Sequence, residues 1–161
     1  MRRIVLFIIA FILWLLLTWT LNWQHLLVGV IVAIFVALLF GNMFVEEPRK
    51  FFQIKRYFWF LVYIPLFLWE CLKANFDVAY RVLHPKMPIK PGIVKVKTGL
   101  KSEVARTMLA NSITMTPGTL SVDIDGQYLY IHWIYVRATE VEEASRMIVS
   151  KFEPLLARIF D

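Results

Sequence analysis

Charged residues are missing from most of the first 45 positions of the chain. Between Ile4 and Val45 the sequence contains no Asp, Glu, Lys or Arg. Such a run excludes the surface of an ordinary soluble domain. It is long enough for two helical crossings, because one crossing needs about 20 apolar residues. We therefore predict a two-helix transmembrane hairpin over residues 1–45.

Cysteine and histidine are scarce as well. Cys71 is the only cysteine, which excludes an internal disulfide and a zinc site built from thiolates. The three histidines, His25, His84 and His132, lack the spacing of a metal site. The sequence contains neither a phosphate-binding glycine loop nor a G-x-S-x-G motif. We therefore expect no enzymatic activity, no metal and no cofactor.

A polar cluster divides the apolar segment in two. Asn22, Gln24 and His25 interrupt it, with Trp19 and Trp23 nearby. Polar groups are costly in hydrocarbon and tryptophan favours the headgroup level, so we expect this cluster to form a turn at a membrane interface. A cleaved signal peptide is the alternative for the first 19 residues. It is disfavoured because a second apolar span follows at once, without a small-residue cleavage site.

The basic residues indicate an orientation in the membrane. The chain carries 18 Lys and Arg against 12 Asp and Glu, a net charge of +6. Most of these cations flank the apolar segments, which favours the positive-inside rule over nucleic-acid binding. With Arg2 and Arg3 inside, the N-terminus and the soluble part are predicted to be cytoplasmic. The expected location is the cytoplasmic (inner) membrane, in a multi-pass protein that contacts the lipid bilayer.

Small residues recur on one face of the second predicted helix, which runs from Leu26 to about Phe44. Gly29, Ala33, Ala37 and Gly41 follow one another every four residues. Small side chains let two helices approach closely. We interpret these four residues as a candidate helix-packing interface, used either within the hairpin or against another subunit.

Residues 46–83 form the next predicted segment. After a basic loop at 46–50, the pattern from Phe51 to Leu83 predicts a helix with one polar stripe and a broad apolar face. The helix could cross the membrane or lie in its interface, and the basic loops on both sides favour the interface. Four charged residues of the stripe have the spacing of ion pairs, with an ion pathway as the alternative: Glu70, Lys73, Asp77 and Arg81.

A proline-rich linker at 84–92 leads to a small domain at 93–161. Alternating patterns predict strands from Ile93, over 120–125 and over 128–136, with a hairpin turn at Asp125-Gly126. Ser102 is expected to cap a first helix, and Thr116-Pro117-Gly118-Thr119 to form a turn. The fold class is thus a membrane hairpin and a third amphipathic helix, followed by an α+β ferredoxin-like (βαββα) cytoplasmic domain.

The last helix and the strand surfaces complete the predicted domain. Thr139 and Glu142 form a capping-box pattern, and Pro154 is expected to kink the helix that follows. Asp123 and Asp125 are interpreted as solvated strand residues. The aromatic residues of the third strand region predict a partner-packing surface, with a ring-binding site as the alternative: Tyr128, Tyr130, His132 and Tyr135.

One stretch resembles a known family. Residues 110–122, ANSITMTPGTLSV, resemble the hallmark segment of the E subunit of Mrp/Mnh-type multisubunit cation/proton antiporters. Residues 73–78, 91–92 and 130–133 resemble the same family, and the match spans the chain. The resemblance implies a small subunit of an inner-membrane assembly whose other subunits carry the proton channels and the cation exchange. Related subunits occur in energy-converting membrane-bound hydrogenases.

The leading functional hypothesis is a non-catalytic accessory or assembly subunit of a Na+/H+ antiporter module, with the other subunits as partners. One alternative is the equivalent subunit of a membrane-bound hydrogenase complex. Another is direct participation in the ion pathway through Glu70, Lys73 and Asp77. A third is a membrane-anchored regulator that binds a ligand through an aromatic strip, formed by Tyr128, Tyr130, His132 and Tyr135.

Overall fold

The computed structural model describes residues 2–41 and 53–161. The chain divides into two compact units, Met1–Gln53 and Ile54–Asp161. The helix predicted from Phe51 on therefore packs with the unit that contains the sheet. Three predicted features fall outside the described residues: the end of the second helix at 42–44, the loop at 46–50 and the start of the third helix at 51–52.

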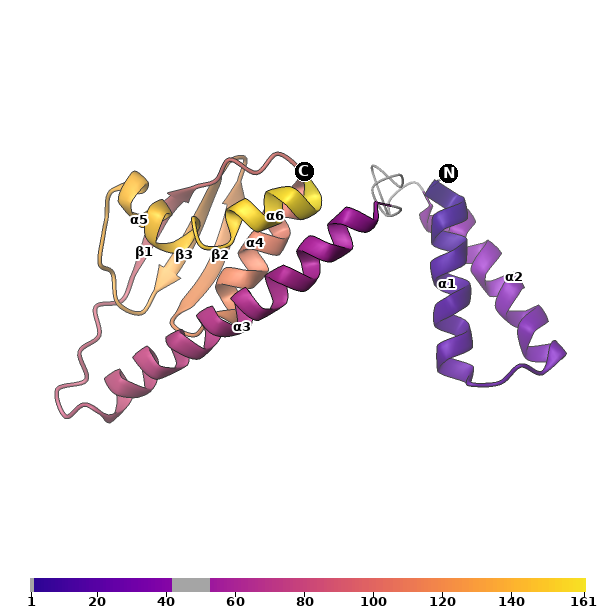
Figure 1. Ribbon diagram of the computed structural model, residues 1–161, viewed down its shortest axis with the longest axis horizontal. Coiled ribbons are helices and arrows are strands. Elements are labelled where there is room, and N and C mark those ends of the chain that lie inside the picture. Colours follow the sequence, from indigo (N-terminus) through magenta and orange to yellow (C-terminus); the bar gives the residue numbers. More distant parts are fainter. Residues whose placement is uncertain (1, 42–52) are drawn as a thin grey trace. The chain divides into compact units, whose positions relative to one another are not determined.

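The first unit is a helical hairpin of α1 (Arg2–Thr18) and α2 (Trp23–Phe40) (Figure 1). The predicted turn ends three residues too late, because Gln24 and His25 already belong to α2. Asn22 is the physical reason. Its side-chain oxygen accepts the Gln24 backbone N–H at 3.1 Å, which satisfies a donor at the helix start and fixes that start there.

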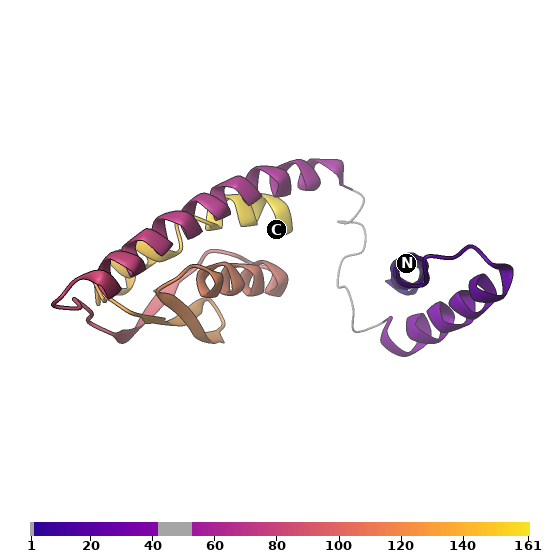
Figure 2. The ribbon, with the colours of Figure 1, turned by 90° about the horizontal axis from the view of Figure 1, so that it is seen from below.

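The second unit begins with α3 (Ile54–Leu83), a helix of 30 residues with Pro65 inside it. By length and composition, α2 and α3 are the described helices long and apolar enough to cross a membrane, and α1 is shorter. Figure 2 shows α3 running beside α6 (Glu153–Phe160), and the two helices are in contact. The predicted helix end at Leu83 is confirmed.

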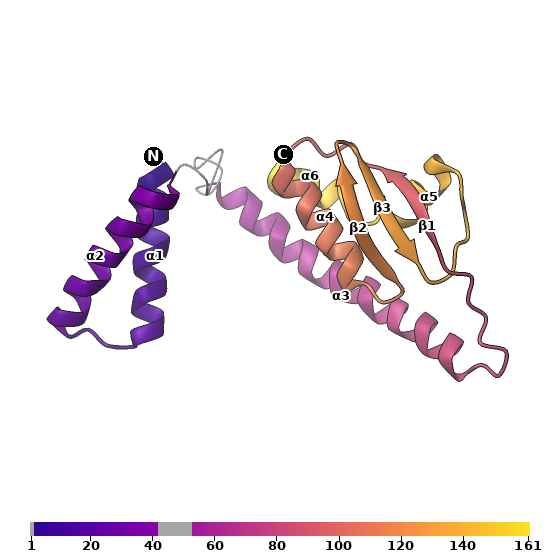
Figure 3. The ribbon, with the colours of Figure 1, turned by 180° about the vertical axis from the view of Figure 1, so that it is seen from behind.

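A three-stranded antiparallel sheet follows, with the order β1-β3-β2 (Figure 3). Its strands are β1 (Gly92–Lys97), β2 (Thr119–Asp125) and β3 (Tyr128–Trp133). Gly126 has φ +57° and forms the predicted hairpin turn. Val122 is the extra residue of a bulge in β2, where the pairing shifts between Ser121 and Asp123.

The remaining helices are α4 (Glu103–Met115), α5 (Val141–Ile148) and α6. The Ser102 cap is confirmed, because its hydroxyl accepts the Ala105 N–H at 3.1 Å. The capping box is wrong: Glu140 occupies the N-cap of α5 and makes no side-chain cap bond. The single kinked helix is also wrong. Pro154 lies in the first turn of a separate helix, α6, where its missing N–H costs nothing.

The core lies on one face of the sheet. Val96, Leu129 and Ile131 are fully buried there, together with Leu109 of α4 and Leu156 of α6. The other face carries rows of polar and aromatic side chains along paired strand positions. One row joins Lys95, Tyr130 and Asp123, and the next joins Lys97, Tyr128 and Asp125. These rows agree with the interpretation of both aspartates as solvated strand residues, and both are exposed.

Candidate functional site

The small residues of α2 pack against α1. Gly29, Ala33 and Ala37 are buried in the hairpin, and Ala33 keeps only 1% of its surface exposed. A Cβ atom added at Gly29 would collide with the Trp14 indole, and one at Gly41 with the Arg3 side chain. The Trp14 indole also donates to the His25 carbonyl oxygen at 3.0 Å. The candidate packing interface is therefore occupied within the hairpin itself.

The polar stripe of α3 faces the α/β domain, and Glu70 is its most buried carboxylate. Glu70 pairs with Lys73 one turn further along α3 and with Lys151, between α5 and α6, at 3.4 Å. Its side chain is 10% exposed, whereas the two lysines are about half exposed. The carboxylate is thus held between two cations, one from each side of the helix–domain boundary.

A second ion-pair cluster lies near the end of α3. Arg81 donates through Nε and Nη2 to the two Asp77 carboxylate oxygens, at 2.9 and 3.0 Å. Its Nη1 donates to the Pro88 carbonyl oxygen at 2.8 Å, and its guanidinium lies 4.2 Å from the centre of the Tyr135 ring. Arg137 contacts Asp77 at 3.3 Å. One arginine therefore connects α3, the linker and the segment after β3.

The first half of α3 joins the hydrophobic core. Tyr63 is 5% exposed, and its hydroxyl hydrogen-bonds to the Ser112 hydroxyl of α4. The Tyr63 ring packs edge-on against Phe152, 6.4 Å between ring centres. Nearer the start of α3, the Arg158 guanidinium lies 4.3 Å from the centre of the Trp59 ring. Apolar and cation–π contacts therefore hold this half of the helix to α6.

The family-like segment 110–122 contacts α3 at a few positions. The Ser112 hydroxyl hydrogen-bonds to the Tyr63 hydroxyl, and the Met115 carbonyl oxygen lies 3.7 Å from the Cys71 sulfur. Within the segment, the Thr119 hydroxyl is 2.7 Å from the Ile113 carbonyl oxygen, which fixes the turn from α4 to β2. The sequence predicts this turn but gives no sign that it supports another helix.

Gly118 is expected to be the least replaceable residue of that turn. Its φ is +90°, and an added Cβ would lie 3.0 Å from the Ile134 Cγ2 atom and 3.3 Å from Val78 of α3. Gly118→Ala should lower the free energy of unfolding of the full chain in detergent by about 2 kcal/mol, from backbone strain plus crowding. Chemical denaturation followed by circular dichroism measures it.

Gly126→Ala is the matched control for Gly118→Ala. Gly126 also has a positive φ, +57°, but an added Cβ there meets nothing within 4 Å. Its replacement should cost only the backbone term, about 1 kcal/mol. Equal losses in the two variants would contradict a packing role for Gly118.

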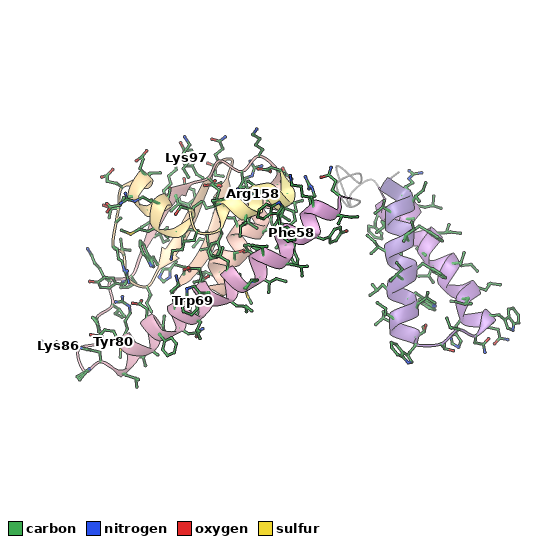
Figure 4. All side chains as sticks on the ribbon, viewed as in Figure 1. Phe58, Trp69, Tyr80, Lys86, Lys97 and Arg158 are labelled. Atoms are coloured by element: carbon green, nitrogen blue, oxygen red, sulfur yellow. The ribbon has the colours of Figure 1, made fainter. Side chains whose placement is uncertain are left out.

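The side of α3 opposite the ion pairs is apolar and exposed. Phe58, Trp69 and Tyr80 of α3, labelled in Figure 4, are each at least 58% exposed. At 100° per residue, the charged residues of α3 fall on the other side of the helix or at its edge. We name this side the apolar face, defined as Ile54, Phe58, Leu61, Leu68, Leu72, Phe76 and Leu83.

The aromatic strip divides into two parts. Tyr128, Tyr130 and His132 point to the open face of the sheet, where the Lys95 ammonium lies 3.9 Å from the centre of the Tyr128 ring. Tyr135 is separate from them and stacks with Arg81. Within residues 2–41 and 53–161, no group of three or more His, Cys, Asp or Glu side chains could hold a metal ion.

Sequence reasoning missed the partners that the domain supplies. Lys151, Arg137 and Ser112 contact α3 from positions 49 to 81 residues away in the chain. Spacing within α3 predicts i,i+3 and i,i+4 pairs, but it carries no signal for contacts of such range. The predicted pairs Glu70–Lys73 and Asp77–Arg81 both occur. In addition, each carboxylate pairs with one cation from the domain, Glu70 with Lys151 and Asp77 with Arg137.

These features define a class of protein: a helical hairpin joined to a small α/β domain, with ion pairs that connect elements of the fold. The family model described as "MNHE: Na+/H+ ion antiporter subunit" matches residues 7–159. The chain belongs to this family, the E subunits of Mrp-type Na+/H+ antiporters, which are transporter subunits of multisubunit membrane complexes.

Individual relatives agree with this membership. The chain is 42% identical over 110 residues to the E subunit of the Na+/H+ antiporter of Alkalihalophilus pseudofirmus, covering 67% of this chain and 68% of that protein. It is 42% identical over 106 residues to the corresponding E subunit of Bacillus subtilis, covering 62% and 64%. Among solved structures, a chain of an archaeal respiratory complex, the membrane-bound sulfane sulfur reductase, matches with a TM-score of 0.78. That match has 45% identity and covers 99% of both chains.

Proposed function

We propose that this chain is a non-catalytic assembly subunit of a Na+/H+ antiporter module, and that its charged residues hold its own fold together. One observation carries the proposal: both carboxylates of the α3 stripe are paired with cations from α3 and from the domain. A carboxylate that relays protons or cations must exchange its partner during transport. The ion pairs that Glu70 and Asp77 make with both α3 and the domain support a structural role for the two carboxylates.

Conservative amide variants test this against an ion-pathway role. Glu70→Gln and Asp77→Asn, introduced into the whole complex in everted membrane vesicles, should leave Na+-driven proton movement within about twofold of the parent, because a path through other groups is untouched. Loss of transport in a complex that retains all its subunits would overturn the proposal. The amount of each subunit in the vesicles, measured by immunoblot, separates that result from failed assembly.

The hairpin and the α/β domain are proposed to occupy different environments. We propose that residues 1–45 form a transmembrane hairpin, which α1 and α2 close through Gly29, Ala33 and Ala37, and that residues 93–161 form a cytoplasmic domain joined by the 84–92 linker. The strand order β1-β3-β2 supports a ferredoxin-like arrangement without its fourth strand. Arg3 at the start of α1 supports a cytoplasmic N-terminus.

A respiratory host complex is the second candidate. The observation in its favour is the match over 99% of both chains to a subunit of the archaeal sulfane sulfur reductase. Gentle extraction of the tagged subunit from native membranes, followed by mass spectrometry, distinguishes the two. Antiporter subunits alone support the antiporter host; redox subunits with iron–sulfur clusters would replace it with the respiratory host. Recovery without partners would overturn both.

A further inference from the structure

The α/β domain follows α3 along almost its whole length. At one end, the Arg56 guanidinium lies 3.5 Å from the Phe160 carbonyl oxygen, and at the other, the Arg81 guanidinium lies 4.2 Å from the centre of the Tyr135 ring. At 1.5 Å per residue these contacts extend over about 38 Å of helix. The hydrocarbon core of a bilayer is only about 30 Å thick. If α3 crossed the membrane in this packing, the domain would have to enter the membrane with it.

The domain carries charges that hydrocarbon does not accept. Lys151 meets Glu70 near the middle of α3, and its side chain is 47% exposed. Arg137 meets Asp77 two turns further on and is 50% exposed. In a crossing helix, Lys151 would lie close to the bilayer midplane, where ammonium groups are strongly disfavoured. A crossing position of α3 is therefore unfavourable in this packing, although its length and composition allow one.

The apolar face has the features of a surface that meets lipid. Its seven residues are 48–84% exposed, and none of them is charged. Trp69 and Tyr80 lie at one edge of this face, where amphipathic rings match the headgroup level. Lys55 and Lys73 continue the same edge, because 18 residues are five complete helical turns. Aromatic and basic residues beside an apolar stripe are typical of helices that lie in a membrane interface.

We propose that α3 lies in the plane of the membrane interface, with its apolar face in the lipid and the α/β domain on the headgroup side. The occupant of the apolar face is thus the bilayer itself. In this position every charged group of the domain stays in water or among headgroups. The proposal is independent of the assembly role, because it concerns the chain and lipid alone.

Three spin-label positions measure the orientation directly. Leu61, Leu72 and Leu83 follow one another at 11-residue intervals, so they lie on one line along the exposed side of α3. Each is replaced by cysteine in a Cys71→Ser background of the full chain, which is reconstituted in phosphatidylcholine–phosphatidylglycerol vesicles. Collision with oxygen and with a water-soluble nickel chelate gives the depth of each label. Glu142→Cys on α5, which is exposed, is the control that must stay in water.

An interfacial helix gives three shallow depths, which should agree within about 5 Å. A crossing helix separates the first label from the last by about 33 Å along its axis, so unequal depths would overturn the proposal. Three labels that collide freely with the nickel chelate would also overturn it, since the apolar face would then need a protein partner. Neither result bears on the amide-variant transport test, so the two proposals fail separately.

Discussion

Replacing Arg81 with alanine is expected to lower the free energy of unfolding of the full chain by about 3 kcal/mol. Arg81 is 6% exposed and contacts three groups. It donates hydrogen bonds to both Asp77 carboxylate oxygens and to the Pro88 carbonyl oxygen, and its guanidinium stacks on the Tyr135 ring. Its removal leaves a carbonyl without its donor and a carboxylate with one weaker cation. The expected cost stays at the low end for a broken buried pair because the Asp77 side chain is 43% exposed.

Arg137→Ala provides the matched control for Arg81→Ala. Arg137 pairs with the same carboxylate, but at 3.3 Å and with half of its side chain in solvent. Exposed pairs of this kind contribute roughly 0 to 1 kcal/mol. Chemical denaturation of both variants in detergent, followed by circular dichroism, measures the difference. Similar losses would mean that charge balance at Asp77, rather than the contacts of one buried arginine, stabilises this end of α3.

Replacing Gly29 with leucine is expected to break the close packing of the hairpin, at a cost of about 3 kcal/mol. The new side chain would occupy the position of the Trp14 indole, which is fixed by its bond to the His25 carbonyl oxygen. Because the indole cannot yield without losing that bond, α1 and α2 must move apart. The fraction of protein that survives heating as a monodisperse species in mild detergent measures the loss.

A second-site change distinguishes this steric explanation from a general intolerance of leucine. Gly29→Leu combined with Trp14→Ala removes the indole and makes room for the leucine side chain. The double variant should recover at least half of the stability lost in Gly29→Leu, because the two sites are directly coupled. Additive losses in the double variant would contradict packing of Gly29 against Trp14.

Local chemistry explains which parts of the fold could be predicted. The Ser102 cap, the Gly118 turn and the Gly126 hairpin each depend on residues within four positions of one another, and the sequence predicts all three. The Thr139–Glu142 capping box is wrong by a single residue. The pattern predicts Thr139 as the N-cap, whereas Glu140 occupies that position and forms no side-chain cap bond. Pattern alone does not rank such neighbours.

Contacts between residues that lie far apart in the sequence could not be predicted. The polar stripe of α3 is visible in the sequence, and so is the spacing of its internal pairs. What the stripe contacts depends on how the domain folds back, which brings Lys151 to Glu70 and Ser112 to Tyr63. The same limit applies to the small residues of α2, which pattern alone leaves between the hairpin and another subunit. Only the structure identifies Trp14 as the neighbour of Gly29.

The bulge at Val122 has a consequence for the chain before its complex assembles. Leu120, Val122 and Ile124 are 38–55% exposed on β2, which is an edge strand. An apolar edge of regular geometry invites strands of other copies to pair with it and so seeds aggregates. The extra residue interrupts the row of backbone donors and acceptors on this edge. The bulge therefore disfavours the pairing of β2 with strands of other copies of the chain.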